Sequence, residues 1–180
     1  MKRKLLIIAC VSLILNSQFS ILNSLQAQDY DFSAKIGGNT LYFYITSTAK
    51  NTVEVAYPGP SEDEPWKGAR KPHGQVSIPE TVTYDSVLYK VTSIRYCAFK
   101  GCDRITLLVI PSGIKEIGEE AFDGCKGIKN IVSTAIVPPR LDESSFNGVS
   151  LDIPVRVPTG TYPNYETAVG WRQFTEIIEF

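Results

Sequence analysis

The chain has 180 residues, of which 43% are hydrophobic and 21% are charged, and its formal net charge is −1. This size and composition suit a single globular domain with its own hydrophobic core. The near-neutral charge excludes the basic surface that nucleic-acid binding requires, so we expect no nucleic-acid partner.

Residues 1–27 have the pattern of a secretory signal peptide. Basic residues at 2–4 precede an apolar run over 5–15, and a polar stretch ends at Ala27. This segment is too short and too polar at its end to remain as a membrane span. We expect cleavage after Ala27, which removes three positive charges and changes the net charge from −1 to −4. The alternative is lipoprotein processing at Cys10, whose sequence Ile-Ile-Ala-Cys resembles a lipobox, although few apolar residues would then precede the cysteine.

Residues 31–57 alternate with the period of two that is typical of β-strands. Leu41 and Phe43 would face one side of a strand, and Tyr42 the other. The sequence Ile-Gly-Gly-Asn at 36–39 tolerates the positive φ angles of a tight turn. We predict a β-hairpin that caps the next part of the chain.

The segment at 58–72 is predicted to be a loop, because proline and glycine recur throughout it. Residues 28–72 together would form an N-terminal β cap and loop. The acidic run at 61–64 lacks the alternating spacing and central glycine of a calcium-binding loop. We therefore interpret it as solvated surface, and we expect neither a metal nor a cofactor.

One 23-residue pattern is written twice between Val91 and Ile131. The matching pairs are Val91 and Ile114, Ile94 and Ile117, Ala98 and Ala121, Phe99 and Phe122, Gly101 and Gly124, Cys102 and Cys125, Ile105 and Ile128, and Leu108 and Ile131. A repeat of this length indicates a solenoid, in which each unit buries its apolar side by stacking on its neighbours.

Two partial copies extend the array to residues 73–158. The strand-like core Leu-Val-Ile-Pro at 108–111 has counterparts that begin at Val76 and Val155, so about four rungs of parallel strands are predicted. An insertion at 83–91 looks like a small strand pair. The third rung is irregular, because Ser133 stands where an isoleucine is expected.

The pattern I-x-x-x-AF-x-GC-x-x-I-x-x-(L/I), closed by Ile-Pro, resembles the leucine-rich repeats of the BspA-like family of bacterial surface and secreted proteins. Residues 114–125 (IKEIGEEAFDGC) fit this pattern closely, and the Pro138-Pro139 step and the closing segment 157–174 resemble the family too. The resemblance implies an α/β-type repeat solenoid, here a short leucine-rich-repeat array. It also implies a non-catalytic binding role towards host matrix proteins, other cells or glycans, and leaves the ligand open.

Residues 159–180 are predicted to form an aromatic C-terminal cap. Four residues recur at intervals of three: Tyr165, Ala168, Trp171 and Phe174. This spacing suits a short helix that is interrupted at Gly170, and residues 175–180 would form a final strand. Large rings such as Trp171 supply the apolar area that a lid needs. The alternative for Trp171 is stacking on a ligand.

Inside the repeats, Phe99 and Phe122 occupy equivalent positions, and Phe146 continues the series in the third unit. We predict that these rings stack as the spine of the core. Cys102 and Cys125 should likewise lie on adjacent rungs with parallel side chains, about 4.8 Å apart. That geometry does not suit a disulfide, so buried free thiols are expected. Cys97 aligns with Glu120 at a variable repeat position, and of the three thiols it is the one we expect to react more readily.

The sequence offers little support for an enzyme. His73 is the single histidine and lies in a Lys-Pro-His-Gly turn, where a solvated residue is more common than a base or ligand. No nucleophile elbow, zinc signature or phosphate-binding loop is present. The acidic residues Glu119, Glu120 and Asp123 are interpreted as a solvated rim.

Two functions remain open for an exported chain. The first is a secreted or cell-surface binding protein with a protein or glycan ligand. The second is a structural or accessory protein of the envelope or periplasm, which the small number of rungs favours because four strands offer limited contact area. No integral membrane span is expected after the signal peptide.

Strand alternation locates the candidate binding surface on the outward side of the rungs. The outward residues are Gln75, Ser77, Leu107, Val109, Asn130, Val132 and Arg156. We call this set the strand-face strip. Its centre is apolar and its ends are polar, as in many interfaces. The alternative is that its apolar residues only pack on each other or lie beneath the loop at 58–72.

Overall fold

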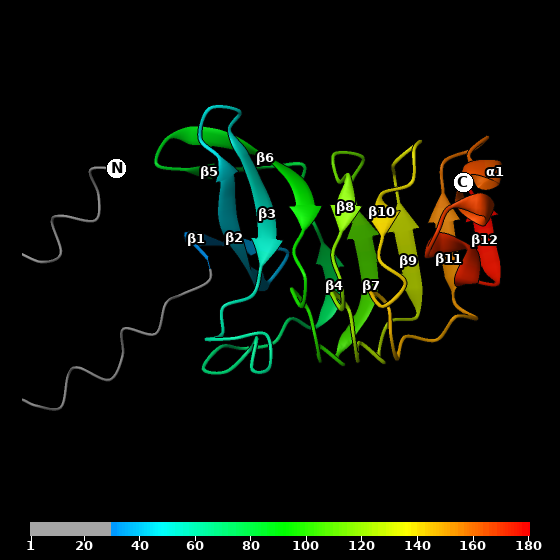
Figure 1. Ribbon diagram of the computed structural model, residues 1–180, viewed down its shortest axis with the longest axis horizontal. Helices are drawn as coiled ribbons and strands as arrows, with labels where there is room; N and C mark the ends of the chain where they lie inside the picture. The colour runs from blue at the N-terminus through cyan, green and yellow to red at the C-terminus, as the bar shows by residue number, and fades with distance from the viewer. Residues whose placement is uncertain (1–29) are drawn as a thin grey trace, which may run out of the picture.

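The computed structural model describes residues 30–180 of the chain. The predicted signal peptide, its cleavage site and the alternative at Cys10 lie outside the described residues. The strands stack side by side along the long axis of the molecule, from the hairpin of β1 and β2 at one end to α1 and β12 at the other (Figure 1).

One sheet contains five parallel strands in the order β12-β11-β9-β7-β4, and we call it the rung sheet. Its strands are β4 (Gly74–Ser77), β7 (Ile105–Ile110), β9 (Asn130–Ser133), β11 (Pro154–Val157) and β12 (Glu176–Glu179). The register aligns Val76, Leu108, Ile131 and Val155 in one row, the residues that lead the expected rungs. Ile177 of β12 extends this row beyond them.

A second sheet of seven strands lies opposite and was not expected. Its strands are β1 (Phe32–Ile36), β2 (Asn39–Ser47), β3 (Thr52–Ala56), β5 (Thr81–Tyr84), β6 (Val87–Ile94), β8 (Glu116–Ile117) and β10 (Arg140–Leu141). Strands β6, β8 and β10 are parallel, and they align Ile94, Ile117 and Leu141. The hairpin β1–β2 continues through β3 into this sheet, because β3 pairs with β6.

The fold is mostly strand with little helix, because the repeats contain turns where an α/β-type array would have helices. Among residues 30–180 the helices are α1 (Tyr162–Thr167) and the 3₁₀ helix η1 (Trp171–Gln173), both outside the repeats. Within the repeats, Cys97 and Glu120 have φ angles of 54° and 52°, and Gly101 and Gly124 have 70° and 71°. A residue in this left-handed region ends a right-handed helical turn, so no helix develops between the sheets.

The predicted phenylalanine column is confirmed. The ring centroids of Phe99 and Phe122 lie 5.1 Å apart with an interplanar angle of 3°, and those of Phe122 and Phe146 lie 5.0 Å apart at 6°. Trp66 stacks on Phe99 at one end, and Trp171 contacts Phe146 at the other. We call these five rings the aromatic column. All of them are buried.

The hairpin and part of the loop lie at the N-terminal end of the stacked strands. The turn of the hairpin lies where the sequence places it, with φ angles of 55° and 86° at Gly37 and Gly38. Next to it, the buried Asn39 side chain donates to the carbonyls of His73 and Gln75 and accepts from the His73 amide. These bonds occupy the outer edge of β4.

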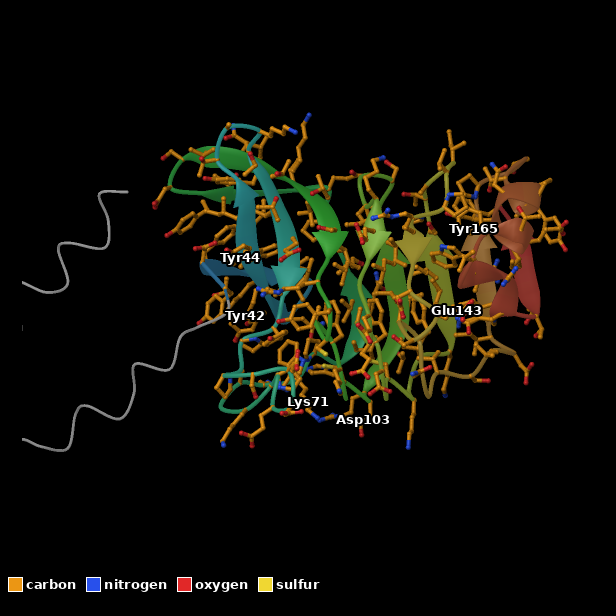
Figure 2. The ribbon with its side chains drawn as sticks, in the orientation of Figure 1. Tyr42, Tyr44, Lys71, Asp103, Glu143 and Tyr165 are labelled. Atoms are coloured by element: carbon orange, nitrogen blue, oxygen red, sulfur yellow. The ribbon has the colours of Figure 1, made fainter. Side chains whose placement is uncertain are left out.

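The C-terminal end is closed by α1, η1 and β12, with Gly170 at a φ of 80° between the two helices. Trp171 is fully buried and its indole N–H donates to the carbonyl of Pro139 at 2.8 Å. Trp171 is therefore a packing residue, and the alternative of a ligand-stacking role is wrong. Tyr165 is also buried, at the cap end of the molecule in Figure 2.

The buried Tyr165 explains the irregular third rung. Its hydroxyl donates to the Ala135 carbonyl at 2.8 Å and lies 2.7 Å from the hydroxyl of Ser133. Ser133 is fully buried on β9 and supplies the partner that the second lone pair of the phenol requires. An isoleucine at 133 would leave this buried hydroxyl with one partner fewer.

Candidate binding surface

The strand-face strip lies together on the outer face of the rung sheet. The register forms two rows across the strands. The first row is Gln75, Leu107 and Asn130, and the second is Ser77, Val109, Val132 and Arg156. Ile178 of β12 pairs with Arg156 and extends the second row, which the sequence analysis missed because it treated β12 as part of the cap.

The strip has a half-buried apolar centre between polar ends. Leu107, Val109 and Val132 are half-buried, whereas Gln75 and Arg156 at the two ends are exposed. The Gln75 side chain donates to the Ser77 hydroxyl at 3.0 Å, which satisfies one polar group at that end. The centre is therefore available for apolar contact, with hydrogen-bonding groups and one positive charge at the margins.

The loop at 58–72 packs on the turn side of the molecule. Its Trp66 ring stacks on Phe99 at 6.3 Å, and the Lys71 ammonium donates to the Gly101 carbonyl at 2.8 Å. Figure 2 shows Lys71 and Asp103 near each other at the lower edge of the view, where the turns of the repeats lie. These contacts place the loop against the aromatic column and its turns. The half-burial of the strip therefore comes from neighbouring strands of the rung sheet.

The cysteines are free and buried, as predicted for Cys102 and Cys125. Burial raises the pKa of Cys125 to about 12, and its thiol donates to the Phe99 carbonyl at 3.1 Å. That Cys97 is the likelier reactive thiol of the three stays a prediction, and the pKa of its thiol is raised less than those of Cys102 and Cys125. Burial raises the pKa of the Cys97 thiol to about 11, and Glu120 adds to this while Lys100 opposes it. The thiolate needed for reaction is therefore scarce at neutral pH.

The single histidine does not form a catalytic pair with an acid in the described region. The His73 ring lies 3.2 Å from the Arg70 guanidinium. Residues 30–180 contain no group of three or more histidine, cysteine or acidic side chains that could hold a metal ion. Within the acidic run, Glu64 pairs with Lys67 at 2.7 Å and is exposed. Nothing in this geometry assembles a nucleophile, a base and an orienting group.

A groove of about 490 Å³ lies on the second sheet beside the C-terminal cap. Its lining includes Glu116, Glu119 and Asp142 from the repeats and Val169 from the cap. The sequence analysis placed Glu119 on a solvated rim and did not identify the groove. The sequence signal for this groove is a pair of apolar residues, Ile136 and Val137, directly before Pro138. It was missed because the segment has no apolar periodicity.

A model of the BspA type leucine rich repeat region matches residues 76–158 with six copies. The chain carries a BspA-type leucine-rich repeat region. Four strands of the rung sheet, β4, β7, β9 and β11, fall in or across this range. No curated protein matches the chain, and within residues 30–180 no helix is long and apolar enough to cross a membrane.

Several solved structures of bacterial leucine-rich repeat proteins are similar. A protein from Bacteroides ovatus is 24% identical, with a TM-score of 0.45 over 83% of this chain and 41% of its own length. A leucine rich cell surface protein from Faecalibacterium prausnitzii is 17% identical, with a TM-score of 0.47 over 84% and 44%. A protein from Bacteroides capillosus is 14% identical, with a TM-score of 0.46 over 83% and 99%. The chain therefore spans less than half of the first two proteins.

Equivalent inward and outward positions of successive repeats vary differently. Leu108 and Ile131 both face the core and are both apolar, whereas of the outward positions one changes from Leu107 to Asn130 and the other stays valine, at 109 and 132. The repeat thus fixes the stacking of the rungs. The chemistry of the strand face is set by this particular chain.

Proposed function

We propose that this is an exported, non-catalytic binding protein that is displayed at the cell surface and recognises a protein ligand through the strand-face strip. The observation that carries the proposal is the apolar pair of Val109 and Val132 on adjacent strands, between Ser77 on one side and Arg156 on the other. The BspA-type repeat supports a binding role, and the signal-peptide pattern of residues 1–27 supports export.

The strip provides shape and chemistry for a modest interface. Solenoids use such repeated strand faces for recognition, and an apolar centre with a polar margin is the usual anatomy of a protein interface. The row crosses several adjacent strands, which favours a protein surface as the ligand. A glycan would require more hydrogen-bonding groups than the centre of the strip offers.

Substitution on the strip tests the site. Val109→Asp combined with Val132→Asp places two charges in the apolar centre and should abolish binding to a partner isolated by pull-down with the wild-type protein. Because half-buried positions can affect folding, Val109→Thr with Val132→Thr is the milder pair and should weaken binding at least tenfold with an unchanged melting temperature. Leu88→Asp, at an exposed apolar residue on β6, is the control. Binding that survives both pairs would show that the strip is not the site.

Protease treatment of intact cells tests the location. Degradation of the protein by an added protease is expected if it is displayed outside the cell. Full protection, with degradation only after the outer envelope is opened, would instead support the periplasmic or envelope accessory role.

A further inference from the structure

The groove on the second sheet is separate from the strand-face strip. It lies where β8 and β10 meet the C-terminal cap, and Ile117, Leu141 and Val169 are among its apolar lining residues. A volume of about 490 Å³ accommodates a few side chains of a peptide.

Exposed apolar residues lie in the groove and next to it in the chain. Val169 lines the groove and is 54% exposed, and Ile136 and Val137, which directly precede the lining residue Pro138, are 69% and 75% exposed. Single exposed apolar residues need no explanation, but a cluster at the mouth of a cavity is typical of an interaction site.

The loop that presents these residues is held in place by the C-terminal cap. The hydroxyl of Tyr165 donates to the Ala135 carbonyl, the Asn164 amide to the Ile136 carbonyl, and the Trp171 indole to the Pro139 carbonyl. Hydrogen bonds thus fix three of the five residues from 135 to 139. The exposed apolar surface is therefore preformed, which lowers the entropy cost of binding a partner.

The charge of the groove selects the partner. Three carboxylates line it, those of Glu116, Glu119 and Asp142. The Arg140 guanidinium is held by Glu116 at 2.7 Å, and hydrogen bonds from Ser144 lower the pKa of Asp142, which keeps it ionised. Within residues 30–180 no lysine or arginine forms an ion pair with Glu119. The groove is therefore lined by three acidic residues and one basic residue. Its net charge is negative, and apolar residues lie beside it.

We propose that this groove docks an extended protein segment in which an arginine or lysine stands next to apolar side chains. The basic group would lie against Glu119 and Asp142, and the apolar side chains would cover Val169 and the residues before Pro138. This is a second interaction surface on the opposite sheet, and it does not depend on the strand-face strip being a binding site.

A random heptapeptide library, selected against the immobilised purified protein, tests the proposal. Enriched peptides should carry arginine or lysine beside leucine, valine or an aromatic residue. For a synthesised representative, the dissociation constant should rise at least fivefold between 50 and 300 mM salt, because partly exposed charges are screened. Selection of no peptide, or of peptides without a basic residue, would overturn the proposal.

Variants place the selected peptide on the groove. Val169→Asp and Glu119→Lys should each weaken binding at least tenfold, and Glu119→Gln should weaken it less. Leu88→Asp is the matched control for Val169→Asp, since the two apolar side chains are similarly exposed, at 58% and 54%. The paired strip substitutions at 109 and 132 should leave this binding unchanged.

Each variant is first checked for a wild-type melting temperature, and Glu119→Gln remains usable if Val169→Asp does not fold. Binding that persists in folded Glu119→Lys and Glu119→Gln proteins, or that is lost in the strip variants, overturns the proposal. A second copy of the chain is the competing occupant. It would appear in sedimentation as a wild-type dimer that Val169→Asp converts to monomer, and this result also overturns the proposal.

Discussion

The interior of the solenoid and its two ends are stabilised in different ways. In the interior, equivalent residues of successive repeats meet each other, as Phe99 and Phe122 do in near-parallel stacking. At the ends there is no next repeat, and each exposed group meets a partner that occurs once, such as Asn39 at β4 or Tyr165 at Ser133. The interior is therefore regular and held by repeated apolar packing, whereas the ends depend on individual hydrogen bonds.

The largest effect should follow from a cavity in the interior. Phe122 is fully buried between two other rings, so Phe122→Ala removes packing on both sides and should cost about 3 to 5 kcal/mol of unfolding free energy. Thermal and denaturant unfolding measure this. Phe122→Leu keeps most of the volume and should cost clearly less. An unchanged melting temperature for Phe122→Ala would contradict the stacked core.

A smaller effect is expected at the N-terminal end. Asn39→Ala removes three hydrogen bonds and leaves the amide of His73 and two carbonyls at the edge of β4 without their partner. We expect a loss of about 2 kcal/mol, since unpaired groups here are only partly buried. Thr40→Ala on the same strand is the control and should cost about 0.5 kcal/mol. Equal losses for the two variants would show that the Asn39 bonds do not close this end.

The C-terminal end offers a test of pairing by a double-mutant cycle. Tyr165→Phe should cost about 1 to 2 kcal/mol, because it removes a buried hydroxyl and leaves Ser133 without its acceptor. In a Ser133→Ala background the cost of Tyr165→Phe should fall by about 1 kcal/mol, which denaturant unfolding can resolve. Additive costs would indicate that the two hydroxyls do not depend on each other.

The difference between the interior and the ends also explains how much of the fold can be predicted from the sequence. The offset of 23 residues predicts the aligned row of Leu108 and Ile131 and the ring stacking, because identical residues in successive repeats must meet each other. The parallel strands β6, β8 and β10 of the second sheet were missed, although the short Ile-x-x-Ile spacing of Ile114 and Ile117 carries their signal. Two-residue strands such as β8 are too short to show a period of two.

The ends could not be predicted in detail because their partners are far apart in the sequence and occur once. Nothing in the loop at 58–72 indicates that Trp66 closes the aromatic column, apart from the presence of a large ring among prolines. The role of Ser133 depends on Tyr165, which is 32 residues away in the sequence. The strand-face strip could be predicted from strand alternation, whereas the groove could not, because it depends on how the C-terminal segment meets β10.

The cysteines extend the comparison to chemical reactivity. Cys102 and Cys125 occupy the same interior position of successive repeats, and Cys97 lies at a variable one. Burial raises the pKa of all three thiols. At pH 8 we expect no measurable labelling of these thiols in the folded protein and rapid labelling in denaturant, measured with a chromogenic disulfide reagent. Fast labelling of Cys102 or Cys125 in the folded state would contradict the closed interior.

The smallest expected effect concerns the reactivity of Cys97. Burial raises the pKa of its thiol to about 11, and neighbouring charged groups also contribute. Its thiol lies 3.7 Å from the Glu120 carboxylate, which disfavours the thiolate, while the nearby Lys100 favours it. Glu120→Gln removes the repulsive charge, should lower this pKa and should speed labelling of Cys97 at pH 9 a few-fold. Lys100→Gln removes the attractive charge and should slow it. Labelling rises about tenfold per pH unit below the pKa, since only the thiolate reacts, so the two variants should shift this rise in opposite directions. An unshifted rise in both variants would mean that burial alone sets the reactivity of Cys97.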